Sequence, residues 1–293
     1  MHVRIIHIAD LPTASRWKGN QTAHLKATCE DPSERTVLLI TDETCVLLGM
    51  PSGLPAACWY NIARNYPYNT PKDQLEQRDF YVPLGPRDTF PFIPPGMVSN
   101  ASTRPHLLNL VVNNDTSPRR PILIDIVAKY KTQHPDLDMY TQSRDLDSRE
   151  WQNLLLASRF TVTPGGHNPE TFRMFEALEA GSIPIISKED YTNPAFHRKS
   201  RVEACGTGDV AWNTVITSPF AKAVSVESWA RLPELLDRLQ NASDDYINQL
   251  QADCGLWYDA LLNRTYFSLL RPGDGLEMWP QAGPVILDTR GNV

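Results

Sequence analysis

The stretch FTVTPGGHNPETFRMFEALEAGSIPIIS, residues 160–187, decides the fold of this chain. Its first residues, Phe160–Thr163, alternate apolar and β-branched side chains, which predicts a short buried strand. Pro164-Gly165-Gly166 ends that strand. Asn168 is a good helix N-cap and Pro169 suits the first helical position, so we expect a helix to begin there. Phenylalanine and leucine side chains then recur at helical spacing and give this helix one apolar face.

The second half of the stretch carries the signals that end a helix and start another strand. Gly181 stands where a helix C-terminus takes a glycine, and Ile183–Ile186 is apolar throughout, as a buried strand is. A strand, a glycine loop and a helix start direct free backbone N–H groups and the positive end of the helix dipole at one spot. The stretch therefore predicts an anion site, most commonly for phosphate.

The charge and hydropathy of the chain exclude two classes of partner. The 293 residues include 28 Lys and Arg against 34 Asp and Glu, a net charge of -6, whereas nucleic acid requires a basic face. No run of about 18 apolar residues is present, so we expect no membrane span. The start, MHVRIIHIAD, indicates a strand rather than a signal peptide. We expect any membrane anchor to lie outside this chain, which would then be a truncated, soluble part of a longer protein.

Glycosylation signals bear on the compartment, whereas the cysteines do not settle it. The five cysteines are too widely spaced for a C-x-x-C zinc module. The N-x-S/T pattern occurs more often than the about two instances that chance gives. Its asparagines are Asn20, Asn100, Asn114, Asn241 and Asn263. This excess favours a glycoprotein of the Golgi or secretory lumen, and accidental tripeptides remain the alternative.

Strands and helices alternate on both sides of a proline-rich segment, residues 84–104, which is the best linker candidate. We expect an α/β architecture of two Rossmann-like domains facing across a cleft, with ligands at the carboxyl ends of the strands. Ala57–Arg64 fits a short helix or an irregular segment, and Pro135–Arg149 fits a polar loop. Strands are expected at Val3–Ile8, Thr36–Ile40, Phe80–Pro83, Leu107–Val112, Val215–Ile216 and Ala223–Val226, and helices at Ile122–Lys131, Arg149–Arg159, Ser228–Leu239 and Tyr246–Leu262.

Three charged residues of the expected helix, Glu170, Arg173 and Glu176, lie three apart on one row. The rigid fork of Arg173 suits a diphosphate. Glu176 lies one turn deeper and could accept hydrogen bonds from ribose or sugar hydroxyls. The alternative is a solvated charge ladder on a surface helix.

Further candidate ligands of a phosphate flank this helix. Arg119 and Arg120 precede Pro121 at another strand-to-helix junction, where one of them could meet the same phosphate or merely keep the loop soluble. His167 stands in the glycine loop and could donate to a phosphate oxygen or contact the base. A simple surface histidine is the alternative.

Two D-x-D tripeptides, Asp136-Leu137-Asp138 and Asp145-Leu146-Asp147, raise the question of a divalent cation. In some sugar transferases such carboxylates hold a metal against the donor diphosphate. A working D-x-D normally ends a buried strand, and these two lie in a polar stretch before a helix. We therefore interpret both as loop residues and expect no metal.

Residues 163–186, TPGGHNPETFRMFEALEAGSIPII, resemble the donor-site motif of exostosin-like glycosyltransferases. In that family a P-x-G loop leads to a helix with an acidic residue, a Thr or Ser and an Arg, and then to an E-A-x-x-x-G-x-I-P-[IV] turn and strand. The close match covers residues 158–187, and a looser one extends over residues 105–262. The stretch Tyr81-Val82-Pro83-Leu84-Gly85 is similar to the ribitol xylosyltransferase branch.

The resemblance implies a GT-B fold with an N-terminal acceptor-side domain at residues 1–103, a nucleotide-sugar-binding domain at 104–262 and a tail at 263–293. It implies a hexosyl or pentosyl glycosyltransferase that moves a sugar from a nucleotide-diphosphate sugar, a UDP-sugar, to a glycan acceptor. Transfer would invert the anomeric carbon and need no metal or other cofactor. The donor-binding residues that it implies are Gly165, Gly166, His167, Glu170, Thr171, Arg173, Glu176, Arg119 and Arg120.

An inverting displacement also needs a base that deprotonates the acceptor hydroxyl. We expect it in the first domain, at Asp42, Glu43 or Asp10, because each follows a predicted strand that would face the cleft. The alternative function is a catalytically inactive nucleotide- or glycan-binding protein on the same scaffold, which would lack a usable base. A two-domain sugar-phosphate hydrolase or epimerase would need an extra acid–base pair beside the loop, and the sequence offers none there.

Overall fold

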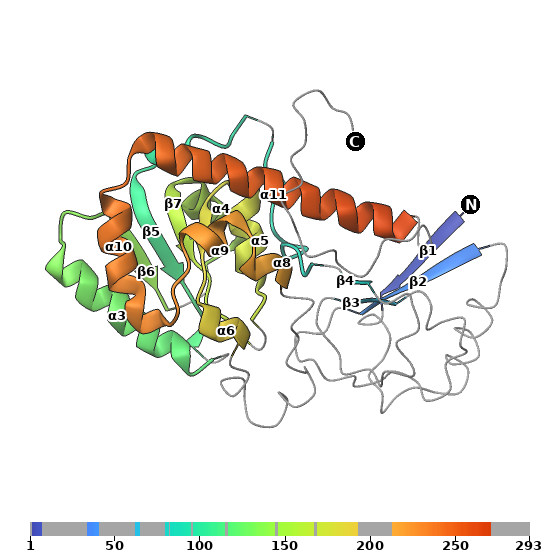
Figure 1. Ribbon diagram of the computed structural model, residues 1–293, viewed down its shortest axis with the longest axis horizontal. Coiled ribbons are helices and arrows are strands. Elements are labelled where there is room, and N and C mark those ends of the chain that lie inside the picture. Colours follow the sequence, from blue (N-terminus) through green and yellow to red (C-terminus); the bar gives the residue numbers. More distant parts are fainter. Residues whose placement is uncertain are drawn as a thin grey trace.

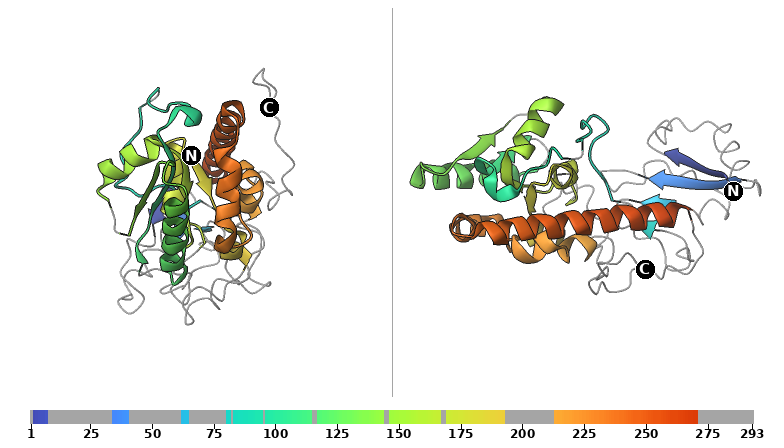
Figure 2. Two further views of the ribbon diagram at one scale, coloured as in Figure 1. Left: turned by 90° about the vertical axis from the view of Figure 1, so that its left-hand side faces the viewer. Right: turned by 90° about the horizontal axis from the view of Figure 1, so that it is seen from above.

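The computed structural model describes residues 2–7, 34–40, 62–64, 80–81, 83–94, 96–114, 117–143, 146–166, 169–192 and 213–270. Its elements gather around two parallel sheets, and the long helix α11 (Asp244–Leu270) runs from beside the second sheet toward the first (Figures 1 and 2). Among the described helices, none combines the length and the apolar character that a membrane span requires.

The first sheet has the strand order β1-β2-β3-β4, with every neighbouring pair parallel. The predicted strands are confirmed at β1 (His2–His7), β2 (Glu34–Ile40) and β4 (Phe80–Tyr81). The expectation of a helix or irregular segment before residue 65 is wrong for β3 (Ile62–Arg64), which pairs with β2. The sequence of β3, Ile-Ala-Arg, has one large apolar side chain and therefore no apolar run, in contrast to the equally short β8 (Ile183–Ile185).

The second sheet has the order β6-β5-β7-β8, also entirely parallel. Predicted strands are confirmed at β5 (His106–Val111), β7 (Ser158–Val162) and β8 (Ile183–Ile185). The polar loop expected over residues 135–149 is wrong in part, because it contains the edge strand β6 (Met139–Gln142). Only Met139 of this strand is buried, so it shows no apolar run.

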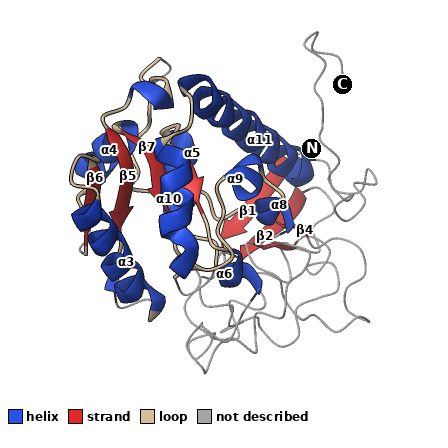
Figure 3. Cartoon of the chain, turned by 60° about the vertical axis from the view of Figure 1, so that its left-hand side comes forward, coloured by secondary structure: helices blue, strands red, loops and turns tan. Residues whose placement is uncertain are grey.

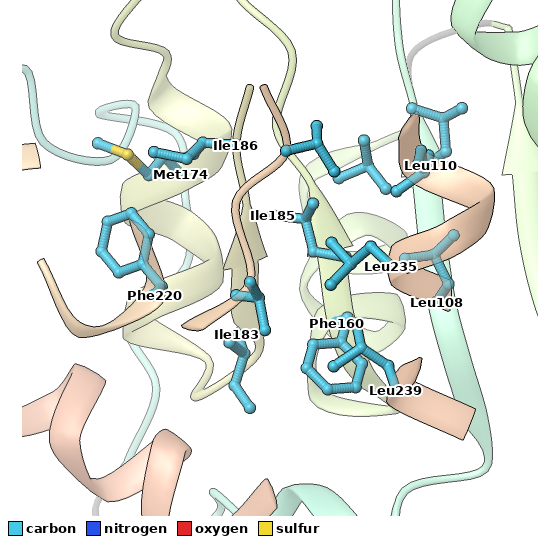
Figure 4. Packing of buried hydrophobic residues seen from close by; sticks show 14 of the residues in the cluster. Leu108, Leu110, Phe160, Met174, Ile183, Ile185, Ile186, Phe220, Leu235 and Leu239 are labelled. Carbon is cyan, nitrogen blue, oxygen red and sulfur yellow. The ribbon is translucent and has the colours of Figure 1, made fainter. Parts of the chain in front are cut away.

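Helices cover both faces of the second sheet, as an all-parallel sheet requires (Figure 3). Leu235 and Leu239 of α10 lie against Phe160 and Leu108 of the strands, in a core of buried side chains (Figure 4). Besides α11, the helices are α3 (Arg119–Gln133), α4 (Ser148–Leu156), α5 (Phe172–Glu179), α6 (Lys188–Thr192), α8 (Asn213–Ile216), α9 (Pro219–Ala223) and α10 (Leu232–Gln240), with 3₁₀ turns η3 (Ala101–Thr103) and η6 (Trp229–Arg231).

Two short strands expected near the C-terminus are wrong. Val215–Ile216 lies in α8, and Ala223 ends α9, whose N-cap Ser218 accepts a hydrogen bond from the Ala221 N–H. Only Val226 pairs as a strand residue would, in an isolated bridge with Ser187. Runs of two to four apolar residues do not distinguish a strand from a buried helical turn.

The start of α5 differs from the prediction, whereas its end agrees. The N-cap is Thr171 rather than Asn168, and the helix begins at Phe172 rather than Pro169. Glu170 is held outside the helix because its Oε1 accepts the Leu84 N–H at 3.0 Å. Gly181 follows the C-terminus with φ +63° as predicted. A Cβ there would lie 2.5 Å from Val98 Cγ1, so the position needs glycine for space as well as for conformation.

The proline-rich segment is docked on the second sheet's layers rather than loose. Gln152 Nε2 donates to the Pro91 carbonyl at 2.6 Å, and Phe90 and Ile93 pack against the cluster around Trp151. Arg104, 1% exposed, donates to four carbonyls, those of Ser99, Leu155, Ser158 and Ala180. Burial lowers its pKa to about 10. The boundary expected after residue 262 falls inside α11.

Candidate functional site

The candidate site lies at the carboxyl ends of β5 and β7, where two strand-to-helix junctions are neighbours. The chain leaves β5 toward β6 on one side and returns to β7 on the other, which makes a topological switch point of the kind that binds ligands in open α/β sheets. The β5–α3 junction carries Arg119 and Arg120, and the β7–α5 junction carries residues 164–171. The structure brings these two predicted groups into direct contact.

Arg120 binds the glycine loop from the inside. The side chain is 3% exposed, and its guanidinium donates to the carbonyls of Gly165 at 3.2 Å, Pro164 at 3.3 Å and Asn113 at 3.0 Å. Two of these charged hydrogen bonds fix the path of the glycine loop, and the third ties Arg120 to the loop that follows β5. Arg120 therefore shapes the loop, and its role as a phosphate ligand stays a prediction.

Asp190 fixes the same loop from the other side, and sequence reasoning missed it. Its carboxylate accepts the N–H of Gly165 at 2.9 Å and the indole N–H of Trp229 at 3.0 Å, and it is paired with Arg119. The N–H of Gly165, predicted to bind phosphate, is thus used inside the protein. Asp190 follows β8 at the same edge of the sheet, which is the signal that could have identified it.

The two glutamates of the predicted charge row point inward. Glu176 is fully buried, with Oε1 accepting the backbone N–H and Nε of Arg87 at 3.3 and 3.0 Å and Oε2 accepting the Trp151 indole N–H at 2.7 Å. Glu170, 3% exposed, accepts the Leu84 N–H. A solvated ladder is therefore wrong for both. Binding of ribose hydroxyls by Glu176 stays a prediction, and both of its oxygens already have protein donors.

Arg173 and the start of α5 remain at the partly exposed side of the junction. The Arg173 side chain is half-buried, with its Cζ 5.9 Å from the centroid of the Trp151 ring. Thr171 caps α5 without a side-chain hydrogen bond to the first turn. Its buried Oγ1 has no hydrogen-bond partner among the described residues. A buried hydroxyl without a partner beside a helix N-terminus is a ready contact for a bound anion.

Tyr191 of α6 contacts helix α5 beside the junction. Its hydroxyl donates to the Met174 sulfur at 3.8 Å. Burial, and next the nearby carboxylates of Glu170 and Asp190, raise the pKa of Tyr191 well above its usual value. The phenol therefore stays neutral at physiological pH and adds no negative charge beside the loop.

The D-x-D carboxylates that the structure describes, Asp136, Asp138 and Asp147, have structural roles or lie at the surface. Asp147 caps α4 by accepting the N–H groups of Arg149 and Glu150, and Glu150 completes a capping box. Asp138 is exposed and lies 2.9 Å from the ring Nδ1 of His106. Across the described ranges, no group of three or more His, Cys, Asp or Glu side chains is arranged to hold a metal.

Several predicted residues lie outside the described part of the chain. They are His167 and Asn168 after the glycine pair, Asp145 of the second D-x-D tripeptide, and the candidate bases Asp10, Asp42 and Glu43. Their roles stay predictions. The residues that the structure adds to the candidate site, Asp190 and Arg87, both make contacts between segments far apart in the sequence.

Comparison with known proteins gives a family and a fold. A family model described as the RXYLT1 C-terminal domain matches residues 87–269. The ribitol-5-phosphate xylosyltransferase 1 of Danio rerio is 25% identical over 163 residues, which cover 54% of this chain and 35% of that protein. The chain thus spans well under two thirds of the length of that relative.

Among solved structures, an alpha-glucosyltransferase in complex with UDP and a 13-mer DNA containing a HMU base matches with a TM-score of 0.50 at 12% identity. The match covers 92% of this chain and 80% of that one. A complex of alpha-glucosyltransferase (AGT) with UDP matches with a TM-score of 0.43 at 12% identity, over 92% and 81% of the two chains. At 12% identity the first of these two matches shows the fold alone, which is α/β and GT-B-like. Because the family model covers more than half of the chain, this protein belongs to the family of the RXYLT1 C-terminal domain.

Proposed function

We propose that this protein is a glycosyltransferase that moves a hexose or pentose from a nucleotide-diphosphate sugar, a UDP-sugar, to a glycan acceptor. The observation that carries the proposal is the β7–α5 junction of a GT-B-like fold. Arg173 and a helix start without a side-chain capping hydrogen bond lie there, at the edge of the sheet where such folds bind ligands. The name of the related ribitol-5-phosphate xylosyltransferase 1 supports the reaction class. Membership of the exostosin-like group is part of the proposal.

In the proposed reaction the leaving diphosphate binds at the start of α5. The helix dipole, the first-turn N–H groups and the Arg173 guanidinium neutralise the negative charge that develops on the leaving group. Arg120 and Asp190 hold the loop in shape, so that little reorganisation is needed when the donor binds. This arrangement supports transfer without a metal, because a cation already stands where the charge develops.

Inversion requires a base on the acceptor side of the sugar. We place it among Asp10, Asp42 and Glu43, which follow predicted strands of the first sheet. A Golgi or secretory-lumen location is also proposed, with any anchor outside this chain. It is supported by N-x-S/T asparagines that are exposed in the structure, Asn100, Asn241 and Asn263.

A thermal-shift screen of nucleotides and nucleotide sugars, followed by a sugar-release assay with the best donor, tests the proposal. We expect UDP and one UDP-sugar to raise the melting temperature, and nucleotide release to require the donor and a glycan acceptor. Binding without any turnover would instead identify an inactive binding protein. No stabilisation by any nucleotide would contradict the proposal altogether.

A further inference from the structure

Arg87 lies in the segment that joins the two sheets, yet it is hydrogen-bonded to Glu176 of helix α5. Its Nε and its backbone N–H both donate to Glu176 Oε1, and its carbonyl accepts the N–H of Phe90 at 2.9 Å. Phe90 in turn packs against the cluster that contains Trp151. The backbone and the inner end of the Arg87 side chain are therefore held in one position.

The outer end of Arg87 is available for a ligand. The side chain is 36% exposed, whereas that of its partner Glu176 is fully buried. Within the described residues, neither terminal amino group of Arg87 donates to a protein acceptor. A guanidinium is a rigid fork with five donors, and fixing its Nε also fixes the direction of the remaining donors. Such an arrangement is preorganised for an oxyanion.

The surroundings of Arg87 favour an anion. Glu176 bonds Arg87 through one oxygen and Trp151 through the other, and the Arg173 guanidinium lies over the Trp151 ring. Arg87 and Arg173 thus flank one carboxylate–indole pair. The neighbouring carboxylates, Glu176 and Glu170, are buried and accept protein N–H groups, whereas both arginines keep an exposed part. Of these four charged groups, the two that keep an exposed part are both cations, and the exposed carboxylate next to them is that of Asp88.

This spot also lies at the start of α5. Leu84, three residues before Arg87, donates its N–H to Glu170, and Glu170 directly precedes the N-cap Thr171. The buried, unpartnered Oγ1 of Thr171 is an independent sign of a missing polar contact in the described structure.

We propose that Arg87 and Arg173 together bind a phosphate-bearing anion at the start of α5. The proposal rests on the proposed function and deepens it. It adds to Arg173 a second cation, Arg87, from the segment that joins the two sheets. The anion is either the diphosphate of the sugar donor or a phosphate carried by the acceptor. The segment's position between the two sheets suits both sources.

Isothermal titration of the whole chain with inorganic pyrophosphate, UDP, uridine and ribitol 5-phosphate tests this inference. We expect Arg87→Gln to weaken pyrophosphate binding about tenfold or more, the typical effect of a charged hydrogen bond. Arg231→Gln is the matched control, because Arg231 is 64% exposed and pairs only at the surface with Glu234. A parallel loss for UDP, with uridine unchanged, assigns the site to the donor. A parallel loss for ribitol 5-phosphate alone assigns it to the acceptor.

The inference is overturned if the wild type does not bind pyrophosphate, or if Arg87→Gln binds it as well as the wild type does. A second measurement avoids any folding defect: pyrophosphate should protect Arg87 of the wild type from modification by phenylglyoxal, read by mass spectrometry. Unprotected Arg87 would also overturn the inference. Pyrophosphate binding without any preference for UDP would contradict the nucleotide-dependent function and leave the anion site standing.

Discussion

The β5–α3 and β7–α5 junctions have the same topology, but the charged side chains that point inward have opposite sign. At the β5–α3 junction the cations point inward, since Arg119 and Arg120 are buried and hold Asp190 and the glycine loop. At the β7–α5 junction the acids point inward, and Arg173 keeps a partly exposed place. The buried arginines of the β5–α3 junction therefore hold the glycine loop of the β7–α5 junction in place. A strand, a loop and a charged helix start do not by themselves show which charges face a ligand.

The largest expected effect comes from Asp190→Ala, which removes the support between the two junctions. It leaves the buried Arg119 without its main partner and Gly165 and Trp229 without an acceptor. We expect a loss of about 3–5 kcal/mol in the free energy of unfolding. Urea denaturation measures it, with Glu227→Ala as the control, because Glu227 is 76% exposed. If both variants unfold alike, Asp190 does not support the loop.

Arg120→Gln removes the inward cation from the β5–α3 junction. Three carbonyls lose a charged donor, so we expect a loss of about 2–3 kcal/mol in unfolding free energy, together with weaker UDP binding. Arg238→Gln is the control, since Arg238 donates to one carbonyl at the surface. Full stability with weakened UDP binding would instead make Arg120 a direct phosphate ligand.

Glu176→Gln tests the inward acid of the β7–α5 junction. It removes the charge that faces Arg87 but keeps an acceptor for the Trp151 indole, so we expect a loss of about 1.5–3 kcal/mol. The affinity for uridine, measured by titration, should stay unchanged. A selective loss of uridine affinity at full stability would show that Glu176 binds ribose hydroxyls and that its inward contacts are secondary.

Asp147→Ala addresses the third strand-to-helix junction, between β6 and α4, and has the smallest expected effect. Loss of the capping box should cost about 1 kcal/mol in unfolding free energy. UDP binding should be unchanged in this variant and in the wild type treated with EDTA. Weaker UDP binding in either case would show that the D-x-D carboxylates contribute to the site after all.

Features that depend on local pattern could be predicted well from the sequence. Most strands of both sheets, the glycine after α5 and the strand–loop–helix unit result from periodicity and from the preferences of Gly and of apolar residues. The same local signals failed at Asn168, because a tertiary hydrogen bond from Leu84 to Glu170 delays the helix start to Phe172. The strands β3 (IAR) and β6 (MYTQ) mix apolar and polar residues without a clear run, so the sequence did not indicate them.

The direction of charged side chains could not be predicted, because it depends on partners distant in sequence. Glu176 points inward because Arg87 and Trp151 reach it from two other segments. Arg120 points inward because the Pro164-Gly165 carbonyls lie beside it in the folded sheet. Asp190 went unnoticed because its role needs the loop, α3 and η6 in place together.

The affinity of Arg173→Ala for UDP, measured by titration calorimetry beside its melting temperature, tests the central claim most directly. The comparison of the two junctions predicts an affinity at least about tenfold lower than that of the wild type. It also predicts only a small fall in melting temperature, because the Arg173 side chain is half-buried and contacts the Trp151 ring from its edge of the junction. Unchanged affinity for UDP would contradict the assignment of the β7–α5 junction as the donor diphosphate site.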